Sequence, residues 1–243
     1  MVVNIAPGIH LQHTSLITEK LNYLTSGIIC FSIEPSTQTI YFLLGQETCF
    51  DDLNSNKGRW CDFGGKVEAE EDILHAAARE FSEESMCVVH LFKSKHVNCS
   101  QEYINEVYEM LLAKDYFLKV SVFLPPEGLS ERVRVYFLKE IPWQPEVILR
   151  FNKARSVLLD IENGNLETIP FHLRKHPALE MKNNEVEGIN KHFLEKFSIM
   201  WWSLDRLQEV IRRKGKYKGH QFRKSFLPVL NVLIKRLKKS FCF

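Results

Sequence analysis

Three glutamates lie close together in a stretch without Gly or Pro, Glu71 to Ser85, that is predicted to be helical. Glu80, Glu83 and Glu84 have the spacings of three and four residues that put side chains on one side of a helix. Apolar residues fall on that same side, namely Ile73, Ala76 and Ala77. The far side carries His75, Arg79 and Ser82. A solvated acidic face should lie opposite the apolar stripe, so surface exposure explains this cluster poorly.

Crowded carboxylates repel one another and raise one another's pKa unless a cation compensates them. Oxygen ligands on a rigid element suit Mg²⁺ or Mn²⁺, and neither Cys nor His is required. Upstream, Gly64 and Gly65 let the backbone approach a ligand closely. The sequence therefore predicts a site for Mg²⁺ or Mn²⁺ on this helix.

The spacing of these residues is specific. From Gly65 the chain has five residues, Glu71, seven residues, and then Arg79-Glu80-Phe81-Ser82-Glu83-Glu84. This pattern resembles the Nudix box, which here would run from Gly65 to Cys87. Met86 departs from it, because it stands where the family usually has Gly. A Met held at positive φ would be strained, which affects the local turn rather than a metal ligand.

The resemblance implies an α+β fold, the Nudix α/β/α sandwich with a mixed central sheet. It also implies an enzyme, a pyrophosphohydrolase that cleaves a nucleoside diphosphate linked to another moiety. Glu80 and Glu84 would bind the metal directly, Glu83 would ligate it or act through water, and the Gly64 carbonyl would join them. Arg79 would orient a glutamate. Gly65 would support the loop, and Glu71 would support the loop or bind a further ion.

The general base is not fixed by the box. Glu83 is the preferred candidate, and three glutamates ahead of a predicted late strand are alternatives: Glu185, Glu187 and Glu195. Glu195 is given low weight among them, because a surface glutamate is the better explanation of this residue.

Strands and helices that position this segment are predicted from hydrophobic periodicity. Two strands joined by a turn at residues 35–38 come first, Gly27 to Ile33 and Thr39 to Gly45. Later elements are a helix from Glu102 to Ala113, strands Arg132 to Leu138 and Phe197 to Trp202, and a helix N-capped by Ser203. An amphipathic helix is predicted from Phe222, Phe226, Leu230, Leu233 and Leu237, with Pro228 in its first turn or kinking it. We expect one domain over residues 1–243, with an irregular elaborated connection at about 142–187.

The charges are unevenly distributed along the 243 residues, although the formal net charge is only +2. From Ile211 onward there are 11 Lys or Arg and no Asp or Glu, which leaves 21 basic and 30 acidic residues before it. Residues 211–243 are therefore predicted to be a basic helical segment, and such asymmetry suits polyanionic partners. No apolar run reaches the ~20 residues that cross a bilayer, and the scattered cysteines suit free thiols, so a cytoplasmic protein without membrane contact is expected.

The sequence indicates the residues that contact the substrate less clearly. Tyr103 and Tyr108 could stack on a base, although aromatic residues on a helix more often belong to the core. Arg212, Arg213 and Lys216 could bind RNA phosphates, and a solvated helix face explains them about equally well. Three functions stay open: hydrolysis of a small nucleotide derivative, mRNA decapping with the basic segment holding RNA, and a catalytically silent interaction module. The last ranks lowest because all the box glutamates are present. The oligomeric state is not readable from the sequence.

Overall fold

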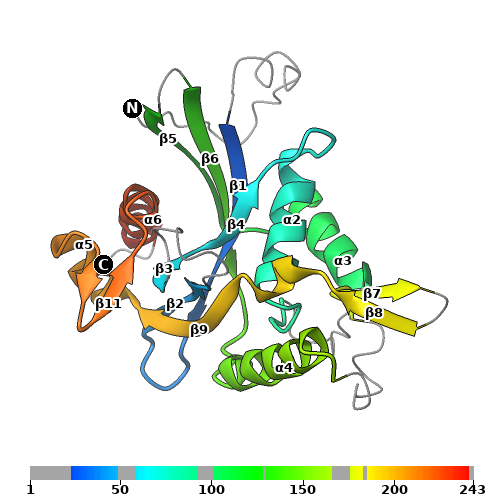
Figure 1. Cartoon of the computed structure of the whole chain (residues 1–243). Coiled ribbons are helices and arrows are strands. Elements are labelled where there is room, and N and C mark those ends of the chain that lie inside the picture. Colours follow the sequence, from blue (N-terminus) through cyan, green and yellow to red (C-terminus); the bar gives the residue numbers. More distant parts are fainter. Residues whose placement is uncertain are drawn as a thin grey trace.

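A mixed β-sheet forms the centre of the molecule (Figure 1). The computed structural model describes residues 23–48, 58–91, 101–127, 130–165, 176–182 and 185–240. Seven strands follow one another in the order β10-β11-β3-β2-β1-β6-β5, while β4 pairs with β1 and β9 pairs with β2. Their bounds are β1 Tyr23–Ile33, β2 Ile40–Glu47, β3 Arg59–Cys61, β4 Phe63–Lys66, β5 Leu118–Glu127, β6 Ser130–Glu140, β9 Lys196–Ser203, β10 Lys216–Tyr217 and β11 His220–Phe222.

Strand β1 shows why the sheet is buried on both faces. Side chains alternate along a strand, and here both sets are apolar. Ile28 and Cys30 belong to one hydrophobic core, and Ile29 and Phe31 belong to the other. Strand β1 pairs in parallel with β6 and antiparallel with β2 and β4, which makes the sheet mixed.

Helices cover both faces of the sheet (Figure 1). On one face lie α2, Ile73–Glu84, and α3, Gln101–Leu112. On the other lie α5, Leu204–Arg212, and α6, Leu227–Ser240. Helix α2 begins after Asp72, whose carboxylate accepts hydrogen bonds from the backbone N–H groups of Leu74 and His75 at 2.7 and 2.8 Å. The expected α+β fold with a mixed sheet between helices is confirmed.

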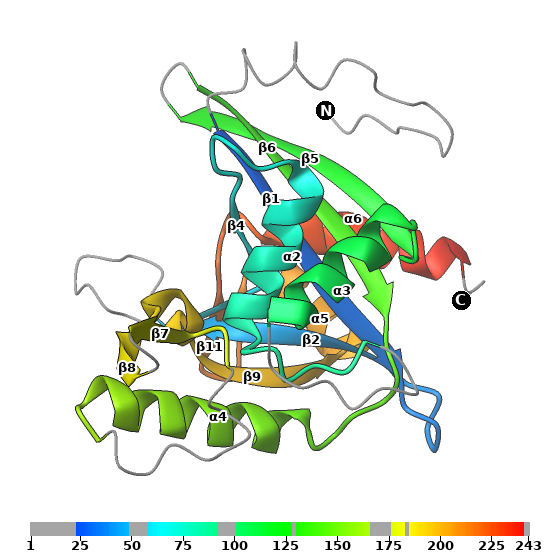
Figure 2. The same ribbon diagram turned by 90° about the vertical axis from the view of Figure 1, so that its right-hand side faces the viewer.

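The connection at 142–187 is more regular than expected. It contains α4, Val147–Glu162, followed by the hairpin strands β7, Leu179–Lys182, and β8, Glu185–Ile189. Helix α4 runs along the edge formed by β9, beneath α2 and α3 in Figure 2. The short helix η3, Lys191–Leu194, then leads into β9 and contacts α2. Mixed polarity hid α4 in the sequence, because only one side of it packs inward, through residues such as Phe151 and Leu158.

Most of the other predicted elements are present with shifted ends, including the strand pair β1 and β2, the helices α2 and α3, and strand β9. Ser203 caps α5, where its hydroxyl accepts a hydrogen bond from the Arg206 backbone at 3.4 Å. The predicted helical segment 211–243 is interrupted, because residues 216–222 form the β10–β11 hairpin, and Phe222, which the periodicity places in the last helix, lies in a strand. Pro228 does lie in the first turn of α6. Within the described ranges, no helix has the length and apolarity needed to cross a membrane.

Candidate active site

Two glycine contacts place the loop before α2 against the sheet. Gly64 in β4 lies opposite Gly27 in β1, and a Cβ on Gly27 would come within 2.5 Å of the Phe63 carbonyl oxygen. A Cβ on Gly65 would fall on the carboxylate of Glu80 in α2. Only glycine permits both approaches, so the loop backbone and the acidic side of α2 come together directly.

Arg79 organises three of the carboxylates. Its guanidinium donates to Glu71 at 2.6 and 2.9 Å, to Glu80 at 2.9 Å and to Glu83 at 3.1 Å. It also donates to the Lys66 carbonyl oxygen at 3.1 Å. Because arginine presents its donors in a rigid fork, one side chain fixes the loop and two glutamates of the helix together.

Glu84 is held from two directions. Its Oε2 accepts a hydrogen bond from the Gly64 N–H at 2.7 Å, and its Oε1 lies 2.8 Å from the Nζ of Lys196. Lys196 is fully buried and also donates to Glu47 Oε1 at 3.0 Å and to Cys61 Sγ at 3.1 Å. Arg223 donates to the same Glu47 oxygen at 3.1 Å.

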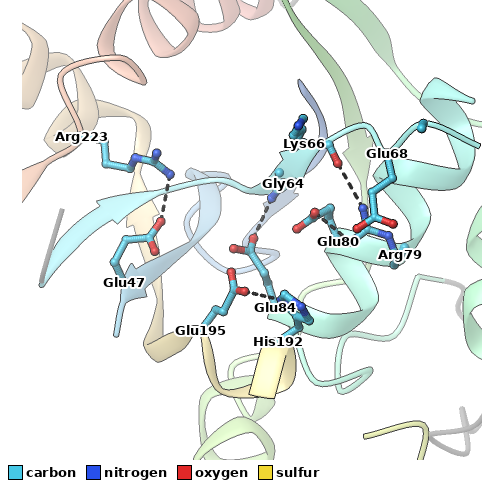
Figure 3. A pocket seen from close by; sticks show the side chains of 12 residues that line it. Glu47, Gly64, Lys66, Glu68, Arg79, Glu80, Glu84, His192, Glu195 and Arg223 are labelled. Carbon is cyan, nitrogen blue, oxygen red and sulfur yellow. Dashed lines mark hydrogen bonds and ion pairs between the residues drawn. The ribbon is translucent and has the colours of Figure 1, made fainter. Parts of the chain in front are cut away.

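Several of these residues line a cavity of about 510 Å³. Figure 3 shows Arg223 with Glu47 at one end, Arg79 with Glu80 at the other, and Glu84 directed at Gly64 between them. The lining residues are Glu47, Gly64, Gly65, Lys66, Glu68, Ala69, Arg79, Glu80, Glu84, His192, Glu195 and Arg223. The cavity therefore joins β2, the β4 loop, α2, η3 and the segment after β11.

His192 and Glu195 form a hydrogen-bonded pair on the wall of this cavity, with 2.6 Å between His192 Nδ1 and Glu195 Oε1 (Figure 3). Asn190 caps η3, so its side chain accepts a hydrogen bond from the His192 N–H at 3.0 Å. The contact of η3 with α2 brings this pair to the acidic helix.

Burial dominates the electrostatics of the glutamates on α2. Burial raises the pKa of Glu80 to about 7, although Arg79 opposes the shift. The pKa values of Glu83 and Glu84 are also raised by burial, against Arg79 and Lys196 respectively. Burial would lower the pKa of Lys196, but the Cys61 sulfur and the carboxylates of Glu84 and Glu47 raise it well above its ordinary value. For His192 the hydrogen bond to the Glu195 carboxylate raises the pKa above its ordinary value.

The donor chemistry fits a hard divalent ion. Glu80, Glu84 and Gly64 meet at the cavity, and buried carboxylates with raised pKa values gain most from an added cation. Within the described ranges, however, no three His, Cys, Asp or Glu side chains are gathered into a ready metal cluster. The carboxylates of Glu80 and Glu83 form ion pairs with Arg79, and that of Glu84 forms one with Lys196. A metal ion would therefore have to share these carboxylates with the two side-chain cations.

Glu71, Arg79, Glu80, Glu83 and Glu84 are thus brought together with Gly64 and Gly65. The proposed substrate contacts are not among them. Tyr103 belongs to the core, with 1% exposure, and its hydroxyl donates to the Val89 carbonyl oxygen at 2.8 Å, so it cannot stack on a nucleotide base. Arg212 and Arg213 pair with Glu209, and neither they nor Lys216 line the cavity.

Sequence reasoning missed Glu47, His192, Lys196 and Arg223, and undervalued Glu195. Glu47 and Lys196 are register partners in the β2–β9 pair, which no local pattern reveals because the residues are far apart in the chain. Ser82, placed on the far side of α2, is fully buried and donates to the Ala78 carbonyl oxygen at 2.6 Å. Glu187 does not line the cavity, and the side chain of Glu185 is outside the described part of the structure.

Met86 has the positive φ expected for its position, 53°, and the next residue, Cys87, has 55°. The Met86 side chain is fully buried in the core that α2 and α3 cover. The turn after α2 therefore keeps the left-handed backbone without a glycine, and the side chain packs inside.

Comparison with known proteins identifies one family. The model of the NUDIX domain matches residues 24–154. Among curated protein sequences, none is significantly similar to this chain.

Several solved structures resemble it distantly. A Caenorhabditis elegans Ap4A hydrolase in a binary complex has 15% identity and a TM-score of 0.38, covering 88% of this chain and 98% of that one. The NUDIX domain of Shewanella oneidensis NrtR, complexed with ADP ribose, has 11% identity and a TM-score of 0.44, covering 96% and 99%. A mutT/nudix family protein from Listeria innocua has 13% identity and a TM-score of 0.45, covering 91% and 98%. Identities and TM-scores this low bear on neither the substrate nor the site residues.

Proposed function

The chain belongs to the Nudix family of pyrophosphohydrolases, and from this premise we propose that it hydrolyses the pyrophosphate bond of a small nucleotide derivative with Mg²⁺ or Mn²⁺ as cofactor. The substrate class is a nucleoside diphosphate linked to another moiety. The observation that carries the proposal is the meeting of Gly64, Glu80 and Glu84 in one cavity, with Arg79 and Lys196 holding the glutamates from opposite sides.

Gly64, Glu80 and Glu84, which line the cavity, would hold the divalent ion, and Glu83 would act on it through water. A bound ion neutralises phosphate oxygens, polarises phosphorus and lowers the pKa of an attacking water. The protein then has to position the reactants and preorganise charge. Arg79 would do so by fixing Glu80 to the loop through Glu71 and the Lys66 carbonyl, and the exposed side chain of Lys66, which lines the cavity, would meet a substrate phosphate.

The pair His192–Glu195 is the best placed to accept the proton of the attacking water. Both residues line the cavity, whereas Glu83 is hydrogen-bonded to Arg79 and does not line it. The Glu195 carboxylate fixes the orientation of the imidazole, which leaves the other ring nitrogen to take a proton. We therefore prefer this pair to the box glutamate Glu83 as the general base.

A turnover assay on a mixed panel tests the function. The panel contains dinucleoside polyphosphates, nucleotide sugars and capped RNA, each with Mg²⁺, with Mn²⁺ and with EDTA. Hydrolysis of a small nucleotide that EDTA abolishes supports the proposal. Absence of turnover on every substrate in both metals would favour the silent interaction module.

Capped RNA remains the alternative substrate, and residues 211–243 would then bind the RNA. Binding through Lys and Arg to phosphates must weaken steeply as salt increases. A flat salt response, or cleavage of small nucleotides with no cleavage of capped RNA, would exclude it. We place the activity in the cytoplasm, and the buried thiols of Cys30 and Cys61, which form no disulfide, are in keeping with that compartment.

A further inference from the structure

Lys196 is an unusual residue at this position, because lysines are almost never fully buried. Its ammonium has three donors, and all three have acceptors: Glu84 Oε1 at 2.8 Å, Glu47 Oε1 at 3.0 Å and Cys61 Sγ at 3.1 Å. Two carboxylates and a sulfur atom thus converge on one nitrogen, as ligands converge on an ion.

The sheet reserves space for this side chain. Lys196 begins β9 and lies across from the end of β2, where Glu47 is its register partner. A Cβ on Gly45, two residues earlier in β2, would come within 2.8 Å of Lys196 Cδ and 3.0 Å of Cε. The aliphatic part of the Lys196 side chain occupies the space that a Cβ on Gly45 would need. The pairing of β2 with β9 therefore fixes the buried position of the ammonium.

The charges divide the site into two halves. On the β2 side, the carboxylates of Glu47 and Glu84 face the cations of Lys196 and Arg223, so this half is neutral. On the loop side, a single guanidinium, that of Arg79, faces three carboxylates. These three are Glu71, Glu80 and Glu83. Carboxylates therefore outnumber cations on the loop side, so an added divalent cation would be compensated on the Glu80 side of Glu84.

We propose that Lys196 acts as a resident cation of the site, which takes the place of a divalent ion on the Glu47 side of Glu84 and competes with the bound ion for that carboxylate. In the metal-free protein it compensates Glu47 and Glu84 in the protein interior. With metal bound, it lies against the same carboxylate as the ion and weakens the binding of the ion. The inference rests on the proposed metal site, because it assigns a role toward the same ion.

Opposite effects on the metal-free and the metal-bound protein follow from this role. In Lys196→Met the aliphatic stem is kept and only the charge is lost. Removing one partner of a buried ion pair leaves uncompensated charge, so the variant in EDTA should melt roughly 5–10 °C below the wild type. With the competing cation gone, the Kd for Mn²⁺ should fall by at least about tenfold.

Thermal unfolding in EDTA and in Mn²⁺, together with Mn²⁺ titration by calorimetry or electron paramagnetic resonance, measures both effects without an activity assay. The matched control is Lys191→Met, which removes a charge of the same kind from an exposed lysine paired with Glu162 at 2.8 Å. The control should match the wild type in both measurements. Mn²⁺ should raise the melting temperature of Lys196→Met more than it raises that of the wild type or of Lys191→Met.

Two results would overturn the inference while the proposed function stands: equal stability of Lys196→Met and wild type in EDTA, or weaker Mn²⁺ binding by the variant. Failure of the wild type to bind Mn²⁺ or Mg²⁺ at all would overturn both. If Lys196→Met does not fold even with Mn²⁺, the double variant Glu47→Gln/Lys196→Met decides. Recovery of a folded protein supports the charge role, and no recovery contradicts it.

Discussion

His192 Nδ1 lies 2.6 Å from Glu195 Oε1 on the wall of the cavity that Glu80 and Glu84 also line. Under the proposed function, this contact would supply a proton-accepting pair from the η3–β9 segment, outside the segment that resembles the Nudix box. It also accounts for the raised pKa of His192, because the carboxylate stabilises the charged imidazole.

The pair should act as a unit. Glu195→Gln and His192→Asn are each expected to lower kcat by about 10²–10⁴ with little change in KM, the usual range for loss of a general base. The double variant should be no slower than the slower single variant, because the two residues serve one proton transfer. Additive losses in steady-state kinetics would contradict this prediction.

The pH dependence separates His192 from the glutamates of α2. In the proposed mechanism the neutral imidazole would be the base, so activity should be lost as the pH falls through the raised pKa of His192. Without the Glu195 carboxylate that pKa falls toward 6.5, the ordinary value, so the acidic limb of kcat/KM should move to lower pH in Glu195→Gln. If the limb stays in place, Glu80 or another group sets it.

Arg79 should be irreplaceable by lysine. An ammonium keeps the charge but cannot bridge Glu71, Glu80, Glu83 and the loop carbonyl at once. Arg79→Lys is expected to weaken Mn²⁺ binding and to lower kcat/KM by about 10–100-fold, the range for residues that orient metal ligands. Arg206→Lys, an exposed change on α5, is the control. Wild-type Mn²⁺ affinity in Arg79→Lys would refute the positioning role.

Met86 offers a test of strain against packing. Its left-handed backbone costs about 1–2 kcal/mol, while truncation of a buried Met costs about 2–5 kcal/mol. Packing should win, so Met86→Gly is expected to be less stable than the wild type, although glycine is the usual residue of the family. Met86→Ala loses the side chain and keeps the strain, so it should be less stable still. Denaturant unfolding measures both, and a stabilised Met86→Gly would show that the side chain contributes little.

Local patterns predicted the parts of the site that are close in sequence. The spacing from Gly65 to Glu84 is contained in one loop and one helix, so helix geometry alone brings its glutamates together. Lys196 and Glu47 meet only through the β2–β9 pairing, whose register depends on the whole sheet. Helix α4 was missed for a related reason, since it buries only one side and has no capping hydrogen bond from Glu146 at its start.

The charge asymmetry of the chain has a different meaning in the folded protein. Arg223, counted in the basic segment, belongs to the site and pairs with Glu47 at 3.1 Å. Arg212 and Arg213 pair with Glu209 on their own helix. Part of the basic charge therefore compensates the acidic body within the same molecule, which a count along the sequence cannot show.

The central claim is that the glutamates of α2 hold a divalent ion for pyrophosphate hydrolysis, and Glu84→Gln tests it most directly. Glu70→Gln, an exposed neighbour of the same loop, is the matched control. On the best substrate of the panel, Glu84→Gln should fold like the wild type by circular dichroism and lose Mg²⁺- or Mn²⁺-dependent turnover by at least about a hundredfold, while Glu70→Gln keeps it. Full activity in a folded Glu84→Gln would contradict the assignment.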